Sequence, residues 1–451
     1  MAGRDDIEFG TVKVPTLFRK IFIPTLLGMA SWSFITVADG IFVGQGVGSH
    51  GIAAINICYP VFIILAGFAL MVGMGASVAA SIHLSKDNVK AARINTTQAL
   101  WFASIVSLMA TAVALSFPHG ISRLLGASPS LEPLVVDYLV YMVPSALFQM
   151  WAMIGLFMIR LDGSPKYAMW CNVVPAMLNM MLDWVFIFPL GMGIKGAAIA
   201  SAISTAVAGV MSSAYFLFKA KTLKLYRLKT TVTSLRLTLR NVGYQCRIGF
   251  PALLGEMTMA MLMITGNLVF MEHVGDDGVA AFGVACYYLP FVFMFGNAIA
   301  ESAQPIVSFN YGLGRKDRVA EALAISCRTG VIGSLLSIVA FTMFPDQLVY
   351  IFIGSTGRAS LIAVDGFPYF AAGFLFFILN LVAVGFFQSI ERVKPALAFA
   401  LLRGVLFMIP CFLLLPEYIG TNGIWLAMPF TEAATTLFII LYMLINRKRL
   451  F

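Results

Sequence analysis

Two side chains that carry oxygen atoms lie four residues apart in the segment NMMLDW, Asn179 and Asp183. On a helix this spacing places both side chains on the same face. A carboxylate beside an amide oxygen supplies hard ligands for a small cation such as Na⁺, or a group that can hold a proton. The structural alternative is a hydrogen bond between Asn179 and a protonated Asp183.

The composition indicates that the surroundings of this pair are a lipid bilayer. Of the 451 residues, 60% are hydrophobic and only 11% are charged, whereas a soluble globular chain carries roughly 25% charged residues. So few charges cannot cover a solvated surface, which excludes a soluble enzyme, and so much apolar area excludes a disordered chain. The six cysteines are scattered singly and the four histidines lack metal-ligand spacing. No catalytic motif of a known kind is present, so we expect neither enzyme activity nor a cofactor.

Twelve apolar stretches are long enough to cross the hydrocarbon core, which takes about 20 residues of helix. Strand alternation is absent, which argues against a membrane barrel. The stretches cover about 15–44, 52–83, 94–117, 134–159, 166–190, 194–218, 243–271, 278–310, 319–345, 361–389, 394–415 and 422–446. The sequence therefore predicts an all-α membrane protein with twelve transmembrane helices.

The basic residues predict the orientation of these helices. With both ends of the chain in the cytoplasm, 27 of the 30 lysines and arginines lie in inner loops or at inner helix ends, Arg403 among them. Only Arg123, Lys195 and Arg358 then face outward. We expect a plasma (inner) membrane protein whose charged start, MAGRDDIEFG, is a cytoplasmic tail. The net charge of +9 reflects this asymmetry, and we expect neither a nucleic-acid partner nor an obligate protein partner.

The chain contains two copies of one pattern. The segment KIFIPTLLGM (20–29) recurs as RIGFPALLGE (247–256), an offset of 227 residues. Later matches keep the same order, with Pro60 on Pro290, Pro165 on Pro395 and Gly196 on Gly423. With six helices per copy, both copies start on the same side, so they are parallel repeats related by a pseudo-two-fold axis along the membrane normal.

This repeat predicts a domain organisation. We expect an N-terminal six-helix lobe over 1–218, a basic cytoplasmic linker over 219–242 and a C-terminal six-helix lobe over 243–451. Two lobes about a shared axis leave a central cleft, which is the shape of a carrier that works by alternating access.

Five acidic residues lie inside the predicted spans, where a charge costs about 2.5–3.5 kcal/mol at the bilayer centre on insertion scales. They are Asp39, Asp183, Glu256, Glu301 and Glu432. No lysine or arginine lies at matching depth in the same helices, so we expect these carboxyl groups to be protonated, bound to a cation or facing water. A functional role is the default for such residues, although for Glu301 and Glu432 it rests on burial alone.

Asp39 lies in a stretch that also contains Pro24. A proline removes a backbone hydrogen bond and permits a kink, and broken helices accompany binding sites in carriers. The asparagine–aspartate pair, Asp39 and a hydroxyl group of the sixth helix would together surround Na⁺, or the site would hold a proton on Asp183. Glu256 follows Pro251 in the second copy of this helix, where it would attract an organic cation or take a proton.

Four segments carry a resemblance to a known family. They are VADGIFVGQGVGSHGIAAI (37–55), NMMLDWVFIF with GIKGAAIASAIS (179–204), RIGFPALLGE (247–256) and AQPIVSFNYGLGRKDRV (303–319). In these segments, and over essentially its whole length, the sequence resembles the multidrug and toxic compound extrusion (MATE) family. It is most similar to the prokaryotic DinF-like and MepA-like branch.

The resemblance implies an antiporter that exports cationic, lipophilic compounds while H⁺ or Na⁺ moves inward, with the coupling site in the N-terminal lobe. The family's site residues fall on Asp39, Asn179, Asp183 and Ser201, its kink proline on Pro24 and its helix 7 glutamate on Glu256. Many members have threonine where this chain has Ser201, and serine keeps the oxygen. A branch with a further acid in helix 10 matches less well, because the stretch 361–389 offers only Asp365 near its outer end and Asn380 deeper.

Other functions remain open at this stage. A flippase for lipid-linked precursors has a related fold, but its cleft would need buried basic groups for pyrophosphate, and the deep charges here are acidic. A channel and an intramembrane enzyme fit less well than a carrier, because two lobes with proline breaks suit alternating access. The sequence names neither the exported compound nor the coupling ion, since H⁺ and Na⁺ use the same oxygen atoms.

Overall fold

The computed structural model describes residues 7–229, 231–353 and 357–447, and these residues form helices and connecting loops with no strand. The α-helices are α1 (Val14–Gly46), α2 (Ser49–Ser85), α3 (Val89–Ser116), α4 (Pro118–Leu124), α5 (Glu132–Met142), α6 (Ala146–Leu161), α7 (Pro165–Ile187), α8 (Gly193–Ala214), α9 (Val232–His273), α10 (Asp276–Gly312), α11 (Lys316–Met343), α12 (Pro345–Tyr350), α13 (Arg358–Ala371), α14 (Phe374–Ser389), α15 (Val393–Leu401), α16 (Met408–Ile419) and α17 (Thr421–Ile445). Shorter segments are the 3₁₀ turn η1 (Val143–Ser145) and the π-helical η2 (Tyr215–Lys219) and η3 (Leu402–Leu406). The predicted all-α class is confirmed.

The membrane-spanning helices also agree with the prediction. Eleven helical stretches of the described chain are long and apolar enough to cross a bilayer. The pair α13 and α14 passes the same test together, although it is bent by 47°, and Pro368 lies in the last turn of α13. This pair occupies the expected span 361–389, and counting it gives the predicted twelve. Helices satisfy their backbone hydrogen bonds internally, as lipid requires.

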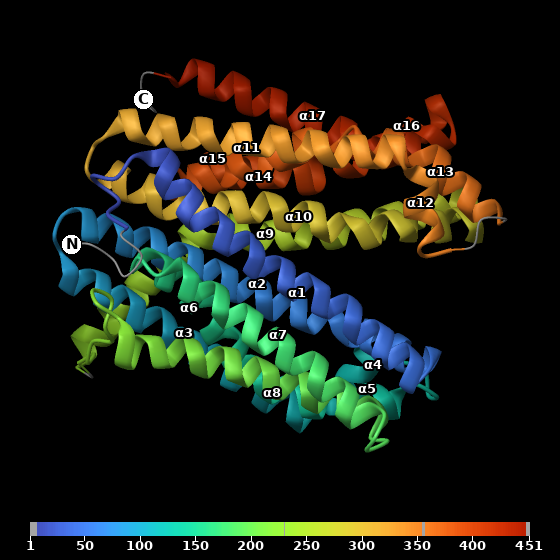
Figure 1. The fold of residues 1–451 in the computed structure, drawn as a ribbon, viewed down its shortest axis with the longest axis horizontal. Helices are drawn as coiled ribbons and strands as arrows, with labels where there is room; N and C mark the ends of the chain where they lie inside the picture. The colour runs from blue at the N-terminus through green and yellow to red at the C-terminus, as the bar shows by residue number, and fades with distance from the viewer. Residues whose placement is uncertain (1–6, 230, 354–356, 448–451) are drawn as a thin grey trace. The chain divides into compact units, whose positions relative to one another are not determined.

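The chain folds into two compact units that do not coincide with its two halves. Unit 1 comprises Met1–Val12 and Ile23–Gly249, and unit 2 comprises Lys13–Phe22 and Phe250–Phe451. Within unit 1, α6, α7 and α8 run side by side, as do α10, α11 and α14 within unit 2 (Figure 1). Two of the boundaries between the units fall inside a long helix, one in α1 just before Pro24 and one in α9 just before Pro251. These two boundaries lie 227 residues apart, which is the offset of the repeat.

The first turns of α1 join unit 2 through apolar contacts. Leu17, Phe18 and Ile21 are buried there. Phe22 stacks on Phe18 and meets the ring of Phe295 on α10 edge to face, with ring centroids 5.9 Å apart. Burial of these side chains accounts for the attachment of this segment to the second half of the chain.

The first turns of α9 join unit 1 mainly through polar contacts with α3. Gln98 Nε2 donates to the hydroxyl of Thr238 at 2.9 Å, and Gln245 Nε2 donates to Asn95 Oδ1 at 2.8 Å. Gln245 is fully buried. Its backbone carbonyl oxygen lies 1.8 Å from the position that a Cβ on Gly75 would take. Only a glycine on α2 allows the two backbones to approach this closely.

A single carboxylate holds the loop that precedes α9. Asp162, at the end of α6, is 6% exposed and accepts hydrogen bonds from the hydroxyl of Tyr215 at 2.7 Å and from three backbone N–H groups. These are the amides of Lys221, Thr222 and Leu223, at 3.0, 2.9 and 2.8 Å. The expected linker is therefore fixed on unit 1 over its first part, and it is helical from Val232 onward.

Candidate functional site

The residues predicted to form an ion site all lie in unit 1, on α1, α7 and α8. Asn179 is 3% exposed and Asp183 is fully buried, and both stand on α7, as their spacing predicts. Ser201 is on α8, which packs along α7, and its Oγ accepts a hydrogen bond from Asn179 Nδ2 at 3.3 Å. The structure thus brings three of the four residues together through one helix pair.

The register between α1 and α7 brings in the fourth residue. A Cβ on Gly28 would lie 3.1 Å from Asn172 Nδ2, so α1 and α7 nearly touch at this level. Asp39 and Asp183 each follow eleven residues later on their own helix, which is about three full turns. The two helices run in the same direction, so the same faces meet again at the level of the two carboxyl groups.

The carboxyl groups of Asp39 and Asp183 face each other in a buried setting. The two groups are close enough for the charge of Asp39 to act on Asp183. Both Oδ atoms of Asp183 and Oδ1 of Asp39 are buried, and none of the three has a hydrogen-bond partner in the described chain. Two ionised carboxylates cannot share such a place, so the pair needs a shared proton or a bound cation.

Tyr138 on α5 also belongs to this group, although the sequence does not predict it. It is 5% exposed and lies within electrostatic reach of both aspartates. No signal in the sequence marks Tyr138, because it stands in an apolar stretch that contains a second tyrosine, Tyr141. Only the packing of α5 on α8 reveals its place.

The predicted kink residue Pro24 lies inside α1, one residue into the part of that helix that belongs to unit 1. The neighbouring hydroxyl of Thr25 is buried, with no hydrogen-bond partner among the described residues. This proline is separated from the carboxyl pair by about four helical turns, so it does not contact the pair directly.

Two of the other predicted acids lie in unit 2, near one another. Glu256 on α9 is half-buried and within electrostatic reach of Glu301 on α10, and Glu301 is 8% exposed. Thr258, two residues beyond Glu256, packs against Gly404 of η3: a Cβ on that glycine would lie 2.4 Å from the threonine hydroxyl.

Glu432 requires a correction. The sequence predicts Arg403 at a cytoplasmic helix end and predicts no basic partner for the buried acids, but Arg403 and Glu432 form a buried ion pair. Arg403 is 2% exposed and Glu432 is fully buried, and Arg403 donates to Glu432 Oε1 from Nη2 at 2.8 Å and from Nε at 3.1 Å. Asn380 Nδ2 donates to the other carboxylate oxygen at 2.6 Å. The prediction was wrong because it compared charges only within one helix, and Arg403 comes from η3 while Glu432 stands on α17.

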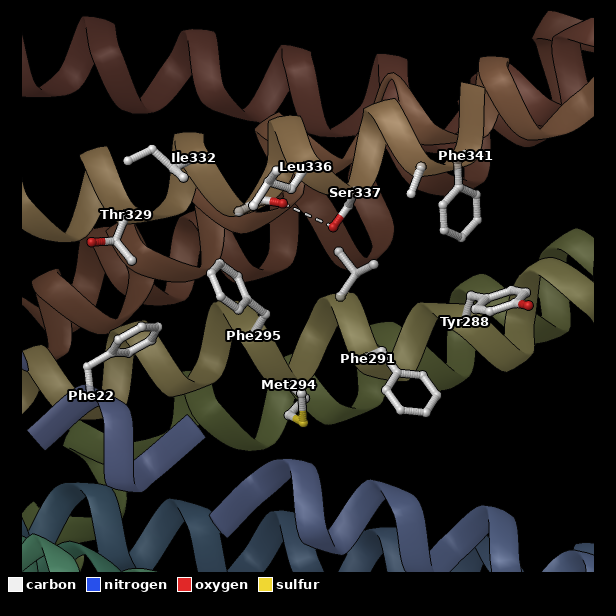
Figure 2. Close-up of a pocket in the computed structure, with 13 residues that line it drawn as sticks. Phe22, Tyr288, Phe291, Met294, Phe295, Thr329, Ile332, Leu336, Ser337 and Phe341 are labelled. Atoms are coloured by element: carbon white, nitrogen blue, oxygen red, sulfur yellow. Dashed lines mark hydrogen bonds between the residues drawn. The ribbon is translucent and has the colours of Figure 1, made fainter. Parts of the chain in front are cut away.

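An apolar pocket of about 530 Å³ lies in unit 2, between α10 and α11. Figure 2 shows Phe22 at one end, with Tyr288 and Phe341 at the other, and Phe295 and Leu336 between them. Its lining contains no charged side chain, and its polar groups are largely occupied. The hydroxyl of Ser337 donates to the carbonyl of Gly333 at 3.0 Å, and that of Tyr288 to the carbonyl of Leu348 at 2.9 Å. Such a surface accepts hydrocarbon rather than an ion.

The chain belongs to the MatE family, whose model matches residues 24–185 and 251–413. The two matched stretches start 227 residues apart, which is the offset of the internal repeat. The resemblance to MATE transporters that the sequence motifs indicated is thereby confirmed.

Curated relatives agree with this assignment. The chain is 27% identical over 428 residues to the FAD transporter of Shewanella oneidensis, covering 91% of this chain and 90% of that protein. It is 25% identical over 445 residues to the multidrug export protein MepA of Staphylococcus aureus, covering 95% and 93%. Both names are those of transporters, and the second supports the prokaryotic MepA-like branch.

Solved structures share the fold. A multidrug resistance MATE family transporter of the MOP superfamily, in an outward-facing conformation, matches with a TM-score of 0.91 at 21% identity, over 100% of this chain and 99% of the other. A MOP superfamily transporter from Pyrococcus furiosus matches with a TM-score of 0.88 at 21% identity, over 97% and 96%. The chain is therefore a multi-pass membrane protein of the MATE efflux family, and these comparisons do not favour the flippase alternative.

Proposed function

We propose that this protein is a secondary active antiporter that exports cationic, lipophilic compounds while H⁺ or Na⁺ moves inward. The observation that carries the proposal is the carboxyl pair of Asp39 and Asp183 in unit 1, three of whose oxygen atoms are buried without a hydrogen-bond partner in the described chain. Asn179 stands on the same helix as Asp183 and donates to Ser201. Because the pair needs a cation for neutrality, loading and unloading of H⁺ or Na⁺ changes its charge. A change of charge at a buried site is what couples an ion gradient to a conformational change.

The oxygen atoms around the pair suit either ion. Asn179 uses its amide N–H₂ group to donate to Ser201, which leaves its carbonyl oxygen available to a cation. With the carboxylates and the serine hydroxyl, this gives a set of hard oxygen ligands of the kind that small cations prefer. A proton shared by Asp39 and Asp183 satisfies the same site without further ligands.

The substrate class follows from the charge and polarity of the protein. The carboxyl pair attracts cations, and the apolar pocket of unit 2 suits the hydrocarbon part of a lipophilic molecule. MepA, a relative at 25% identity, is named a multidrug export protein. The relative from Shewanella oneidensis is named an FAD transporter. FAD is an anion, however, and the carboxyl groups of Asp39 and Asp183 repel an anion when they are ionised.

The basic residues support a plasma-membrane location with both termini in the cytoplasm. In that orientation the drug enters from the cytoplasm, the protein turns outward, and Asp39 with Asp183 then takes up H⁺ or Na⁺ as helix α1 bends at Pro24. One charge that crosses 100 mV supplies about 2.3 kcal/mol, which corresponds to roughly a fiftyfold concentration ratio. Glu256 is a candidate contact for the organic cation, and no cofactor takes part.

The test uses purified protein in liposomes with ethidium as a cationic dye, and with pH and Na⁺ gradients imposed separately. One gradient should drive uphill movement of the dye, and Asp183→Asn should abolish it while the protein stays folded. The matched control is Glu417→Gln, which removes an acid whose side chain is 69% exposed and should leave movement intact. Normal uphill transport by Asp183→Asn would overturn the coupling site. Uphill transport of FAD, but not of ethidium, would overturn the substrate class.

A further inference from the structure

A run of positive charge without any negative charge leads into α9. Residues 219–249 contain eight lysines and arginines and no aspartate or glutamate, although the whole chain has 21 acidic residues. Three of the eight, Arg236, Arg240 and Arg247, stand on the part of α9 that belongs to unit 1, and all three are exposed. We call their common surface the arginine face.

The arginine face lies opposite the face by which α9 is attached. Thr238, Asn241 and Gln245 hydrogen-bond to α3 and so fix which side of the helix points inward. At 100° per residue, the three arginines lie within about 40° of one another, and the middle of their row lies about 120–180° from these contacts. The structure therefore holds the arginines in a row that points away from the rest of unit 1.

Exposed apolar side chains flank this row. Val232 is 85% exposed, Leu237 58%, Leu239 64% and Tyr244 41%. Fully hydrated surfaces seldom combine so much exposed hydrocarbon with arginine, whereas helices that lie at the surface of a bilayer do so regularly. The apolar groups dip toward the acyl chains and the guanidinium groups reach the head groups.

The length of α9 places the arginine face at the level of the head groups. The helix has 42 residues, about 63 Å at 1.5 Å per residue, which is twice the roughly 30 Å of the hydrocarbon core. Its apolar part follows Arg247, so Arg240 and Arg236 precede the hydrocarbon boundary by about 10 and 16 Å of helix. Lys224, Arg227 and Lys229 are also exposed, and the loop that carries them is anchored on unit 1 by Asp162 and by Thr97, whose hydroxyl accepts from the amide of Tyr226 at 2.9 Å.

We propose that the arginine face binds the phosphate head groups of anionic phospholipids in the adjoining leaflet. Guanidinium groups bind phosphate oxygens in a two-pronged manner, and the absence of acids over 219–249 leaves nothing in that stretch to compete with the lipid. This surface is independent of the ion site, because it lies on a different helix. Its function is measured by lipid binding, whereas that of the ion site is measured by transport.

The test measures lipid retained by the full-length protein. The wild type and the triple variant Arg236→Gln, Arg240→Gln, Arg247→Gln are incubated with vesicles of phosphatidylglycerol and phosphatidylcholine at 1:3, extracted in mild detergent and examined by native mass spectrometry. A matched control removes three exposed charges elsewhere, as Lys86→Gln, Lys316→Gln, Arg447→Gln.

The wild type and the control should retain phosphatidylglycerol in preference to phosphatidylcholine, and the preference should weaken at high salt. The triple variant should bind phosphatidylglycerol about a hundredfold more weakly, at about fivefold per arginine. Because these side chains are exposed, its unfolding temperature in phosphatidylcholine should equal that of the wild type. Equal loss in the triple variant and the control, or a wild type with no preference for phosphatidylglycerol, would overturn the proposal.

Discussion

At the scale of single residues, the structure divides the buried acids by the partner that each one meets. Glu432 has a guanidinium at 2.8 Å and therefore carries a fixed, compensated charge. Asp39 and Asp183 have each other as neighbours instead, and we expect this pair to hold an exchangeable cation. Buried acidic residues thus have two roles: Glu432 forms a structural ion pair in unit 2, and Asp39 with Asp183 forms a candidate transport site in unit 1.

Ser201 provides a graded test of the candidate ion site. Ser201→Ala removes the acceptor of Asn179 Nδ2 and one oxygen ligand, so we expect the apparent affinity for the coupling ion to fall about fivefold, the equivalent of one hydrogen bond of about 1 kcal/mol. Ser201→Thr keeps the oxygen and should behave like the wild type. The ion dependence of ethidium efflux in liposomes measures both, and equal behaviour of the two variants would contradict the role of the hydroxyl.

The ion pair in unit 2 predicts a large stability effect. Glu432→Gln leaves the guanidinium of Arg403 buried without a compensating charge, which should cost about 3–5 kcal/mol. Thermal unfolding in detergent should show a clear decrease in the unfolding temperature. Glu417→Gln is the control, because it removes an exposed acid paired with His273 at 3.7 Å, and surface pairs contribute little. Equal unfolding temperatures for the two variants would refute a structural role for Glu432.

At the scale of helices, the carboxyl pair depends on how closely α1 approaches α7. Gly28 faces Asn172 and Gly46 faces Ile187, where an added Cβ would lie 2.1 Å from the isoleucine side chain. Val43, Ile187 and Ala197 form a small apolar cluster at the same end. These contacts hold the two helices in the register that sets Asp39 beside Asp183.

A single methyl group should disturb this register. In Gly46→Ala the new Cβ displaces Ile187 or pushes α1 away from α7, so we expect ion-driven ethidium efflux to fall severalfold, since a misplacement of about 1 Å is costly at a functional site. Gly40→Ala is the matched control on the same helix, because a Cβ there has no neighbour within 4 Å. Initial rates of efflux in liposomes at equal protein content compare the two variants. A decrease of the same size in both would contradict the claim that the α1–α7 register positions the carboxyl pair.

At the scale of the whole molecule, each compact unit includes a short segment from the other half of the chain. Apolar burial attaches the first turns of α1 to unit 2, whereas buried amide groups and glycine contacts attach the first turns of α9 to unit 1. Two segments with the same place in the repeat thus use different chemistry. The repeat therefore fixes where these two segments lie in the sequence, whereas the contacts that attach each segment are particular to the unit it joins.

The attachment of α9 can be tested at one glycine. A Cβ on Gly249 would lie 1.7 Å from the carbonyl oxygen of Met71, a backbone atom that cannot rotate away. We expect Gly249→Ala to destabilise the protein by about 1–3 kcal/mol, as overpacking does. On the same helix, Gly243→Ala meets nothing within 4 Å and should be neutral or slightly stabilising. Unfolding temperatures in detergent, together with elution as a single species in gel filtration, measure both.

Much of the fold was predictable because it depends on local composition. An apolar run of about 20 residues specifies a spanning helix whatever surrounds it, so twelve spans and an all-α class could be predicted from the sequence. The repeat was visible because motifs such as RIGFPALLGE keep their order in both halves. Asn179 and Asp183 could be paired because four residues on one helix make them neighbours.

What the sequence alone determined about this protein is therefore what depends on neighbours along the chain: the helices, the repeat, the family and the positions of buried acids. The tertiary structure decided which of those acids meet which partners. Arg403 reaches Glu432 from a different helix, Tyr138 joins the carboxyl pair from α5, and α9 begins on unit 1. Contacts between helices depend on packing and register, and a pattern along one helix carries no information about the face that another helix presents.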